Sequence, residues 1–408
     1  MSDGTLQTLD VTMLDDVGTG ANQLIQLDSN AKIPACSAAA VTNLPSITKS
    51  SSDPTFSTNP SGGVGTVWQN TTSGEMYICT DATAGANVWT NVGAGSGDIV
   101  PYFHSGENYG FSVMGHNPPS GRIDTINKFS FASDSNATDH GDATHGANAL
   151  SGSSSKTHGF HAGGWDASNS NQSSNRMGKF AFSSNTTGTD HGDLTAAIVN
   201  GVGCSSETHG YHASGSLSSN NSPQADIQKY AFTSNTTAAD VGDLHVTCDS
   251  GSTASSPTQG FVAGGSSNGS GQNIVSTIRK WTFASDGNSV GHGDLSGINA
   301  NAAGCSGETH AIMIGGYSSG TPTLVDKVDK FAYASNTTAS DVGNQNAQRF
   351  GATGAGSTTH AYSAGGNNSS ETRQNNIQKV AFASGTNTTD VADLTIIVAY
   401  PAVGDIQY

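Results

Sequence analysis

Residues 157–164 read THGFHAGG, and this stretch decides the fold because five further segments of the chain follow its pattern. The related segments are NYGFSVMGH from 108, THGYHASG from 208, TQGFVAGG from 258, THAIMIGG from 309 and THAYSAGG from 359, at spacings of 49, 51, 50, 51 and 50 residues. A repeat of this length indicates structural units that each bury an apolar face against their neighbours. The repeat therefore sets the architecture, and every other feature is interpreted against it.

Three more short segments accompany each copy. In the last repeat they are RFGATGAG (349–356), NNIQKVAFAS (375–384) and TDVADLT (389–395). Short apolar runs bounded by Gly, Asn and Ser are typical of strands joined by turns. Each repeat is therefore expected to form four strands, and the chain is expected to be all-β.

Composition excludes several classes of function. A net charge of −17 leaves no basic stripe for nucleic acid. No apolar run approaches the ~20 residues of a membrane span, and the start, MSDGTLQTLDVTML, has no secretory signal. The five cysteines lack metal-ligand spacing, so we expect buried free thiols in a chain that folds in a reducing cytosol.

A lysine in the third strand precedes an aspartate in the fourth by fourteen residues in five repeats, and Asn344 replaces the aspartate after Lys330. A hairpin centred on the Asn-Thr-rich segment between them would place the two side chains opposite each other, for a gain of roughly 0.2–1 kcal/mol per pair. We expect these pairs to be structural. They are Lys128 and Asp142, Lys179 and Asp193, Lys229 and Asp243, Lys280 and Asp294, and Lys379 and Asp393.

Histidine recurs at one position in four repeats, as His158, His209, His310 and His360. Imidazole binds metals, but two copies lack it and no carboxylate or cysteine accompanies it. These histidines are expected to bond the backbone of a neighbouring repeat, and His140, His191 and His292 are expected to fill space. We predict no metal, no cofactor and no catalytic residue, because no catalytic motif is present.

The repeat resembles the kelch family, in which a strand ending in Gly-Gly is typical and the period is about 50 residues. The resemblance covers residues 98–408 and implies a six-bladed kelch-like β-propeller; it departs from kelch in lacking the later Tyr and Trp in every repeat. The tail from about 396 to 408 aligns with the inner strand of a next unit. We expect it to pair with Asn108–His116, the alternative being that residues 98–105 take that place.

The N-terminal quarter carries a second resemblance. Residues 17–46, with GTGANQLIQLD, KIPA and VTNLP, are similar to a segment of phage tail-fibre and related virion proteins. That implies an extended virion-attachment segment over 1–49, usually trimeric. A small β-module over 50–97 follows, in which Trp68, Tyr77 and Trp89 form its own core or, as the alternative, stack on sugars.

The loops between second and third strands differ in length and text from repeat to repeat, and varied loops on a repeated scaffold are where function usually lies. Aromatic rings can stack on sugars, and amides can hydrogen-bond them. The candidate ligand-face residues are Trp165, Tyr317, Asn169, Asn221, Asn268 and Asn367.

The sequence thus predicts a non-enzymatic phage virion protein, a tail fibre or spike that contacts the host surface. Its expected partners are other virion proteins through the N-terminal segment, host-surface glycan, and further copies of itself, a trimer being favoured; nucleic acid and membrane insertion are not expected. It would fold in the host cytoplasm and leave by lysis. The alternatives are a capsid or tail decoration protein without a receptor, and a carbohydrate-active propeller enzyme, for which Asp166 and Glu371 are the acids to test.

Overall fold

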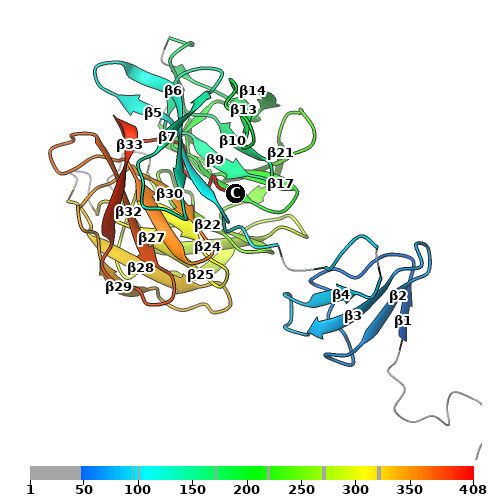
Figure 1. The fold of residues 1–408 in the computed structure, drawn as a ribbon. Coiled ribbons are helices and arrows are strands. Elements are labelled where there is room, and N and C mark those ends of the chain that lie inside the picture. The colour runs from blue at the N-terminus through cyan, green and yellow to red at the C-terminus, as the bar shows by residue number, and fades with distance from the viewer. Residues whose placement is uncertain are drawn as a thin grey trace, which may run out of the picture. The chain divides into compact units, whose positions relative to one another are not determined.

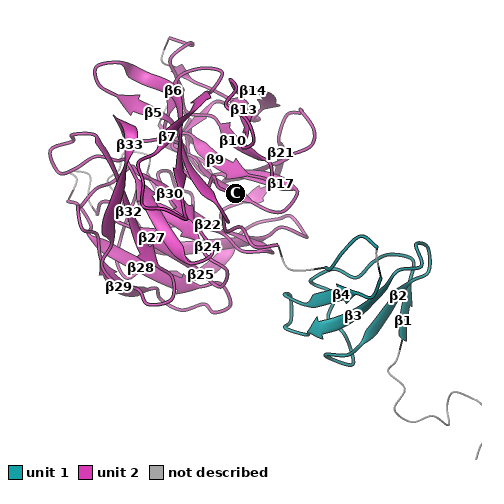
Figure 2. Ribbon diagram, viewed as in Figure 1, with its two compact units in different colours: residues 1–101 teal, residues 102–408 magenta. Residues whose placement is uncertain are grey.

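A computed structural model describes residues 47–93, 95–99, 102–170, 172–217, 221–268, 273–318 and 323–408. Over these residues the protein consists of strands and turns, with no helix, so the all-β prediction is confirmed (Figure 1). No helix of the described part is long and apolar enough to cross a membrane. The chain divides into two compact units, residues 1–101 and 102–408 (Figure 2). Most of the expected attachment segment, residues 1–46, lies outside the described residues.

The smaller unit is one four-stranded sheet in the order β1-β2-β3-β4. Its strands are β1 (Ile47–Ser50), β2 (Val67–Asn70), β3 (Met76–Asp81) and β4 (Val88–Asn91). The first strand pairs parallel to β2, so the sheet takes in residues that the sequence assigned to the attachment segment. Tyr77 and Trp89 are fully buried, and Trp68 packs edge-on against Trp89 at 5.8 Å between ring centroids. These rings therefore form the module's core, as the preferred interpretation expected.

The larger unit repeats one antiparallel sheet in which the strands follow chain order. Five sheets have four strands, and the first has three strands of its own. The strands are β5 (Tyr109–Asn117), β6 (Gly121–Ser130) and β7 (Thr138–Asp142); β9 (Ser151–Ser154), β10 (His158–Ala162), β13 (Arg176–Ala181) and β14 (Thr189–Asp193); β16 (Val202–Ser205), β17 (His209–Ala213), β20 (Asp226–Ala231) and β21 (Ala239–Asp243); β22 (Ser252–Ser255), β23 (Gln259–Ala263), β24 (Thr277–Thr282) and β25 (Val290–Asp294); β26 (Ala303–Ser306), β27 (His310–Ile314), β28 (Lys327–Ala332) and β29 (Ser340–Asn344); and β30 (Thr353–Gly356), β31 (His360–Ala364), β32 (Gln374–Ala381) and β33 (Thr389–Val398).

Residues from the C-terminus complete the first sheet. The backbone N–H of Phe111 donates to Ile406, that of Ala402 donates to Val113, and His116 forms an antiparallel bridge with Ala399. The tail thus pairs with β5, as the sequence predicted. Of the described residues in the rival segment 98–105, His104 lies beside the tail and not in its place, with its Nε2 3.0 Å from the carbonyl oxygen of Asp405.

Six backbone hydrogen bonds join the residues just before the inner strands into one circuit. The six residues have left-handed φ angles between 53° and 63°, and each N–H donates to the carbonyl of the equivalent residue one repeat earlier, over 2.8–3.0 Å. The donors, in order, are Asn200, Ser250, Asn301, Gly351, Tyr400 and Ala149, and Ala149 donates back to Tyr400. The last repeat is therefore joined to the first in the same way as every other pair.

A second circuit of backbone bonds runs around the outer strands. In each case a residue just before a fourth strand donates to the carbonyl of the residue at the aspartate position one repeat earlier, over 2.7–2.9 Å. The donors are Gly188, Ala238, Ser289, Ala339, Thr388 and Ala137, and Ala137 donates to Asp393 of the last repeat. The Asn-Thr-rich segments are thus used as extended links between neighbouring sheets.

This use of the Asn-Thr-rich segments makes the predicted lysine–aspartate pairing wrong. The hairpin turns earlier than expected, so Lys179 lies opposite Thr189 and Asp193 lies opposite Arg176, with a β-bulge between. The other four pairs have the same register. Lys128, Lys229, Lys280 and Lys379 lie opposite Thr138, Ala239, Val290 and Thr389, while Asp142, Asp243, Asp294 and Asp393 lie opposite Thr125, Asp226, Thr277 and Asn376.

Four of the five inner strands carry glycine at the position where they approach one another most closely, and Thr253 takes this position in β22. A Cβ on Gly203 would lie 1.9 Å from the carbonyl oxygen of Gly152 in the preceding repeat, and one on Gly354 would lie 1.8 Å from that of Gly304. Farther out, aromatic rings fill the wider gap between sheets. Phe160 stacks on Phe232 of the next repeat at 4.7 Å between centroids. Large rings outside and glycine inside therefore give each pair of sheets a wedge-shaped spacing.

Candidate functional site

The variable loops all begin on the same side of the repeat. Directly after the second strand, one residue of each loop pairs antiparallel with the segment that leads into an inner strand. Two of these small ribbons have three named strands each. One consists of β8 (Ala147–Asn148), β11 (Trp165–Asp166) and β12 (Gln172–Ser173). The other consists of β15 (Ile198–Val199), β18 (Ser216–Leu217) and β19 (Ser222–Pro223). The equivalent residues are His116, Trp165, Ser216, Ser266, Tyr317 and Asn367. We call this set the ribbon face; it lies at the end of the inner strands where the circuit through Ala149 and Tyr400 runs.

The candidate ligand residues divide on this face. Trp165 is half-buried, and the guanidinium carbon of Arg122 lies 5.9 Å from its ring centroid. Tyr317 is also half-buried, and packs edge-on against Phe350 at 5.4 Å. Burial raises the pKa of Tyr317 to about 12, so its hydroxyl stays protonated. Each ring thus packs against another side chain of the protein and remains partly exposed to solvent.

The four candidate asparagines do not share one environment. Asn169, Asn221 and Asn268 are exposed, and the side-chain oxygen of Asn268 accepts from the Ser266 hydroxyl at 3.1 Å. Asn367 is only 2% exposed, because its backbone pairs with both Phe350 and Arg373. Its prediction as a ligand residue is therefore wrong: it holds the same ribbon position as Trp165 and Tyr317, but its side chain is buried.

A buried polar cluster lies next to Trp165. Asp166 is fully buried and accepts hydrogen bonds from the backbone N–H and the hydroxyl of Ser168, at 2.7 and 2.6 Å, and from Arg176 at 3.2 Å. The Nε2 of His145 lies 3.8 Å from the same carboxylate. Burial alone would raise the pKa of Asp166, but these partners hold it below its usual value.

The cluster stabilises the ionised carboxylate, so Asp166 is held as a structural anion. Burial lowers the pKa of His145, and it lowers that of the adjacent His161 to about 3. Sequence reasoning missed Arg176 and His145 as its partners. The available signal was their departure from the repeat, since Thr277 and Lys327 take the place of Arg176 in later copies. Glu371, the other acid weighed for catalysis, is exposed, with a left-handed φ of 54°.

The recurrent histidines make local and inter-repeat contacts. At the strand-start position, Nδ1 of His158 lies 2.9 Å from the hydroxyl of the preceding Thr157, and the other three repeat this contact, so the expected bond to a neighbouring repeat is wrong there. The histidines expected only to fill space make that bond instead: Nε2 of His140 lies 3.0 Å from the carbonyl oxygen of Ala181. His191 and His292 contact Ala231 and Ala332 in the same way. Among the described residues no group of three or more His, Cys, Asp or Glu could hold a metal ion.

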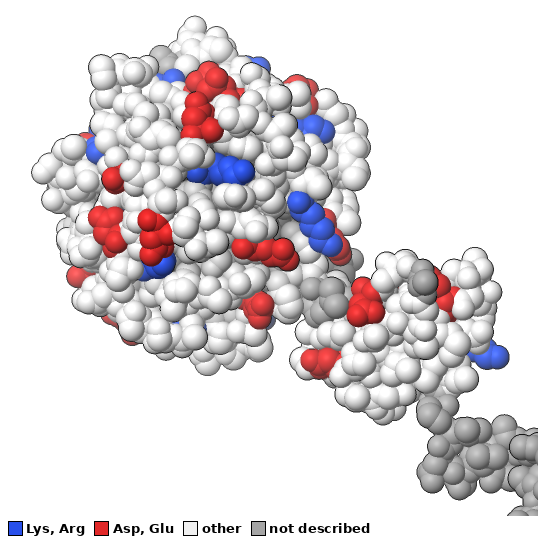
Figure 3. Space-filling model, viewed as in Figure 1, with Lys and Arg blue, Asp and Glu red and all other residues white. Residues whose placement is uncertain are grey.

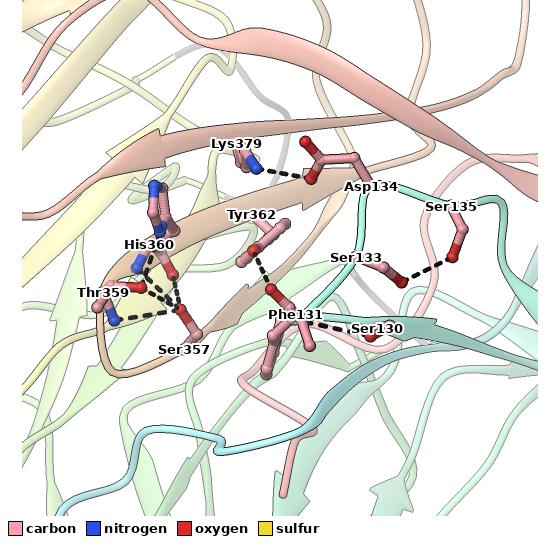
Figure 4. Close-up of polar contacts among 11 residues, drawn as sticks. Ser130, Phe131, Ser133, Asp134, Ser135, Ser357, Thr359, His360, Tyr362 and Lys379 are labelled. Carbon is pink, nitrogen blue, oxygen red and sulfur yellow. Dashed lines mark hydrogen bonds and ion pairs between the residues drawn. The ribbon is translucent and has the colours of Figure 1, made fainter.

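The third-strand lysines also contact the next repeat. Lys229 binds Asp286 at 3.0 Å, and Lys379 of the last repeat binds Asp134 of the first at 2.6 Å. Figure 4 shows this last contact beside Tyr362, whose hydroxyl donates to the carbonyl oxygen of Phe131 at 3.4 Å. On the face shown in Figure 3, acidic and basic side chains are scattered in small groups among neutral residues. Lys229 and Lys379 thus join two sheets rather than two strands of one sheet, whereas the ammonium of Lys128 lies over the Tyr109 ring of its own repeat, 4.0 Å from the centroid.

Free thiols are confirmed for the described cysteines. Cys79, Cys204, Cys248 and Cys305 are buried and unpaired, and burial raises the pKa of Cys204 to about 12. A thiol held protonated in an apolar environment is a poor nucleophile and a poor metal ligand. Cys36 lies outside the described residues.

No protein-family model and no curated protein matches the chain. The solved structure of YjhT is similar to it, with a TM-score of 0.56 at 10% sequence identity, covering 71% of this chain and 97% of YjhT. YjhT is a kelch-type propeller. At this identity the likeness concerns the fold alone, and it agrees with the all-β architecture of the described residues.

Proposed function

We propose that residues 102–408 form a closed six-bladed kelch-like propeller. Two circuits of six backbone hydrogen bonds, one at the inner strands and one at the outer strands, each return to their starting repeat. The ion pair of Lys379 with Asp134 repeats between the last and first sheets what Lys229 and Asp286 do between two adjacent ones. The structural likeness to YjhT supports the same architecture.

We propose further that this chain is a phage virion protein, a tail fibre or spike that contacts the host surface through the ribbon face. The observation that carries the proposal is a division of labour along the inner strands. Backbone groups at two positions that recur in every repeat bond neighbouring sheets, whereas the loops that vary begin at one end of the inner strands. The chain enters this unit at the other end, where His104 contacts Asp405 and Gly106 donates to Gly356. A point of chain entry and a contact face at opposite ends of this unit suit a fibre.

The resemblance of residues 17–46 to tail-fibre segments supports virion attachment, and with it a homo-oligomer, a trimer being favoured. The structural role of Asp166 weakens the enzyme alternative, since Ser168 and Arg176 occupy both of its oxygens. A decoration protein without a receptor would use the same scaffold and attachment, so only a binding experiment separates it from a fibre.

The test measures binding of the full-length protein to host envelope fractions and to a glycan array. We expect binding that is weakened at least tenfold by Trp165→Ala combined with Tyr317→Ala. The matched control is Lys156→Ala, at the opposite end of the strands, where the side chain is 66% exposed and pairs with Glu207. Binding lost equally in the control would refute the ribbon face as the contact surface, and binding absent from the wild type would favour the decoration alternative. Absence of the protein from purified particles, measured by an antibody against residues 102–408, would refute the virion assignment.

A further inference from the structure

A cavity of about 300 Å³ opens on the ribbon face between the fourth and fifth repeats. One wall is the loop at residues 297–299, and the other is the segment 324–327 at the start of β28. Ile298, Leu324 and Val325 supply apolar surface, and Ile298 is 48% exposed at the rim. The space is large enough for one small polar molecule.

Two buried side chains that line this cavity each have an oxygen without a hydrogen-bond partner. Asp329 is 1% exposed; its Oδ2 accepts from the backbone N–H of Ser296 at 3.2 Å, but its Oδ1 has no partner. Asn299 is 3% exposed; its amide donates to the carbonyl oxygen of Gly315 at 2.7 Å, but its Oδ1 has none. A buried acceptor left unpaired costs about 1–3 kcal/mol. A ligand that brings hydrogen-bond donors recovers this free energy.

These two residues depart from the repeat. The position of Asp329 carries no unpaired acceptor oxygen elsewhere. Arg279 donates to the carbonyls of Val246 and Gly264, and the atoms without a partner at this position, Nη2 of Arg279 and Nε2 of Gln228, are donors. The equivalents of Asp329 are Asn127, Gly178, Gln228, Arg279 and Gln378, and those of Asn299 are Ala147, Ile198, Cys248, Arg349 and Val398. Both positions present an unused acceptor oxygen only at the junction of the fourth and fifth repeats. The scaffold therefore does not require this pair.

The charges around the cavity restrict what it can bind. Lys327 lines it, and its ammonium donates to the Ser296 hydroxyl at 3.0 Å and lies 3.7 Å from Asp341. A cationic ligand would meet this ammonium, and an anionic ligand would meet the carboxylates of Asp326 and Asp329. A neutral molecule with several hydroxyls avoids both repulsions, because a hydroxyl donates to an unpaired oxygen and accepts from the ammonium.

We propose that this cavity is a binding site for one neutral sugar residue, with hydroxyls on Asp329 and Asn299 and the apolar face of the ring on Ile298 and Leu324. The site rests on the proposed contact with host glycans and gives that contact a defined sugar pocket. The rings of Trp165 and Tyr317 do not line this cavity, although Tyr317 directly precedes the lining residue Ser318.

The test uses the full-length protein and a panel of glucose, galactose, mannose and N-acetylglucosamine, followed by saturation-transfer NMR and titration calorimetry. We expect at least one of these sugars to bind with millimolar affinity, and Ile298→Trp to weaken that binding at least tenfold by filling the mouth of the cavity. Ile397→Trp is the matched control, because Ile397 holds the equivalent position in the last repeat and is 39% exposed. Asp329→Asn should weaken binding by about tenfold, the loss of one hydrogen bond to a charged group.

Unchanged binding in Ile298→Trp, equal losses in the control, or no binding of any sugar in the panel would overturn the proposal. Because Ile298 is a rim residue, its variant keeps the test valid even if Asp329→Asn fails to fold. The two proposals fail separately. Envelope binding that depends on Trp165 and Tyr317 can persist when this cavity binds nothing, and sugar binding at the cavity can persist in a protein that does not bind host envelope.

Discussion

Replacing Ile406 with alanine is the most direct test of ring closure, because this residue belongs to the C-terminal tail but packs in the core of the first repeats. Ile406 is 1% exposed and lies in one cluster with Phe111, Leu150 and Phe180. Residues of the tail and of the first two repeats therefore share one core. A tail that did not close the ring would leave this side chain in water.

The expected loss follows from how little this core can relax. A Cβ on Gly159 would lie 2.7 Å from Ile406 Cγ2, and one on Gly152 would lie 2.8 Å from its Cδ1. These two neighbours of Ile406 are glycines, so they have no side chain that could move into the space left by the substitution. Removing a buried isoleucine to alanine costs about 2–5 kcal/mol, and sites that cannot collapse lie in the upper part of that range. We expect a loss of about 3–4 kcal/mol.

The assay is calorimetric unfolding of the full-length protein, following the transition of the larger unit. For a unit of this size, 1 kcal/mol corresponds to about 2 °C, so the expected decrease in Tm is about 6–8 °C. Ile397→Ala is the control, since Ile397 is in the same C-terminal region but 39% exposed, and it should lower the Tm by less than about 2 °C. Equal small shifts for both variants would refute closure by the tail.

Three further predictions concern Asp405 of the tail and the contacts between sheets. Burial raises the pKa of Asp405 to about 7. Between about pH 4 and 7 the folded state therefore holds a proton that the unfolded state has lost, so this group makes the free energy of unfolding fall as pH rises. Asp405→Asn should flatten that decline in urea unfolding measured across this pH range, and an unchanged slope would contradict the prediction. Gly203→Ala forces a Cβ to 1.9 Å from the carbonyl oxygen of Gly152 and should lower the free energy of unfolding by about 1–3 kcal/mol or more, so a neutral variant would disprove the close approach. The pair Lys229–Asp286 is partly exposed, at 22% and 41%, so a double-mutant cycle should give a coupling of about 0.2–1 kcal/mol; zero coupling would mean that the lysine does not link the two sheets.

The sequence alone determined the features that depend on neighbours along the chain. The period of about 50 residues and the four strands of five repeats could be predicted, because apolar alternation and Gly-rich turns are local signals. The tail could be placed beside β5 because its sequence aligns with the inner strand that opens each repeat. The burial of Tyr77 and Trp89 in the small module followed from the same kind of pattern.

Only the tertiary structure decided which residues of different repeats meet. The lysine–aspartate spacing suggested partners within a hairpin, but the link from Gly188 to Asp142 draws the turn residues toward the previous sheet and shifts the register. The sequence placed Asn367 in a loop, but in the structure its backbone pairs with both Phe350 and Arg373. The cavity at Asn299 and Asp329 joins side chains of two adjacent repeats. Contacts of this kind depend on how sheets pack in space, and no pattern within one repeat records them.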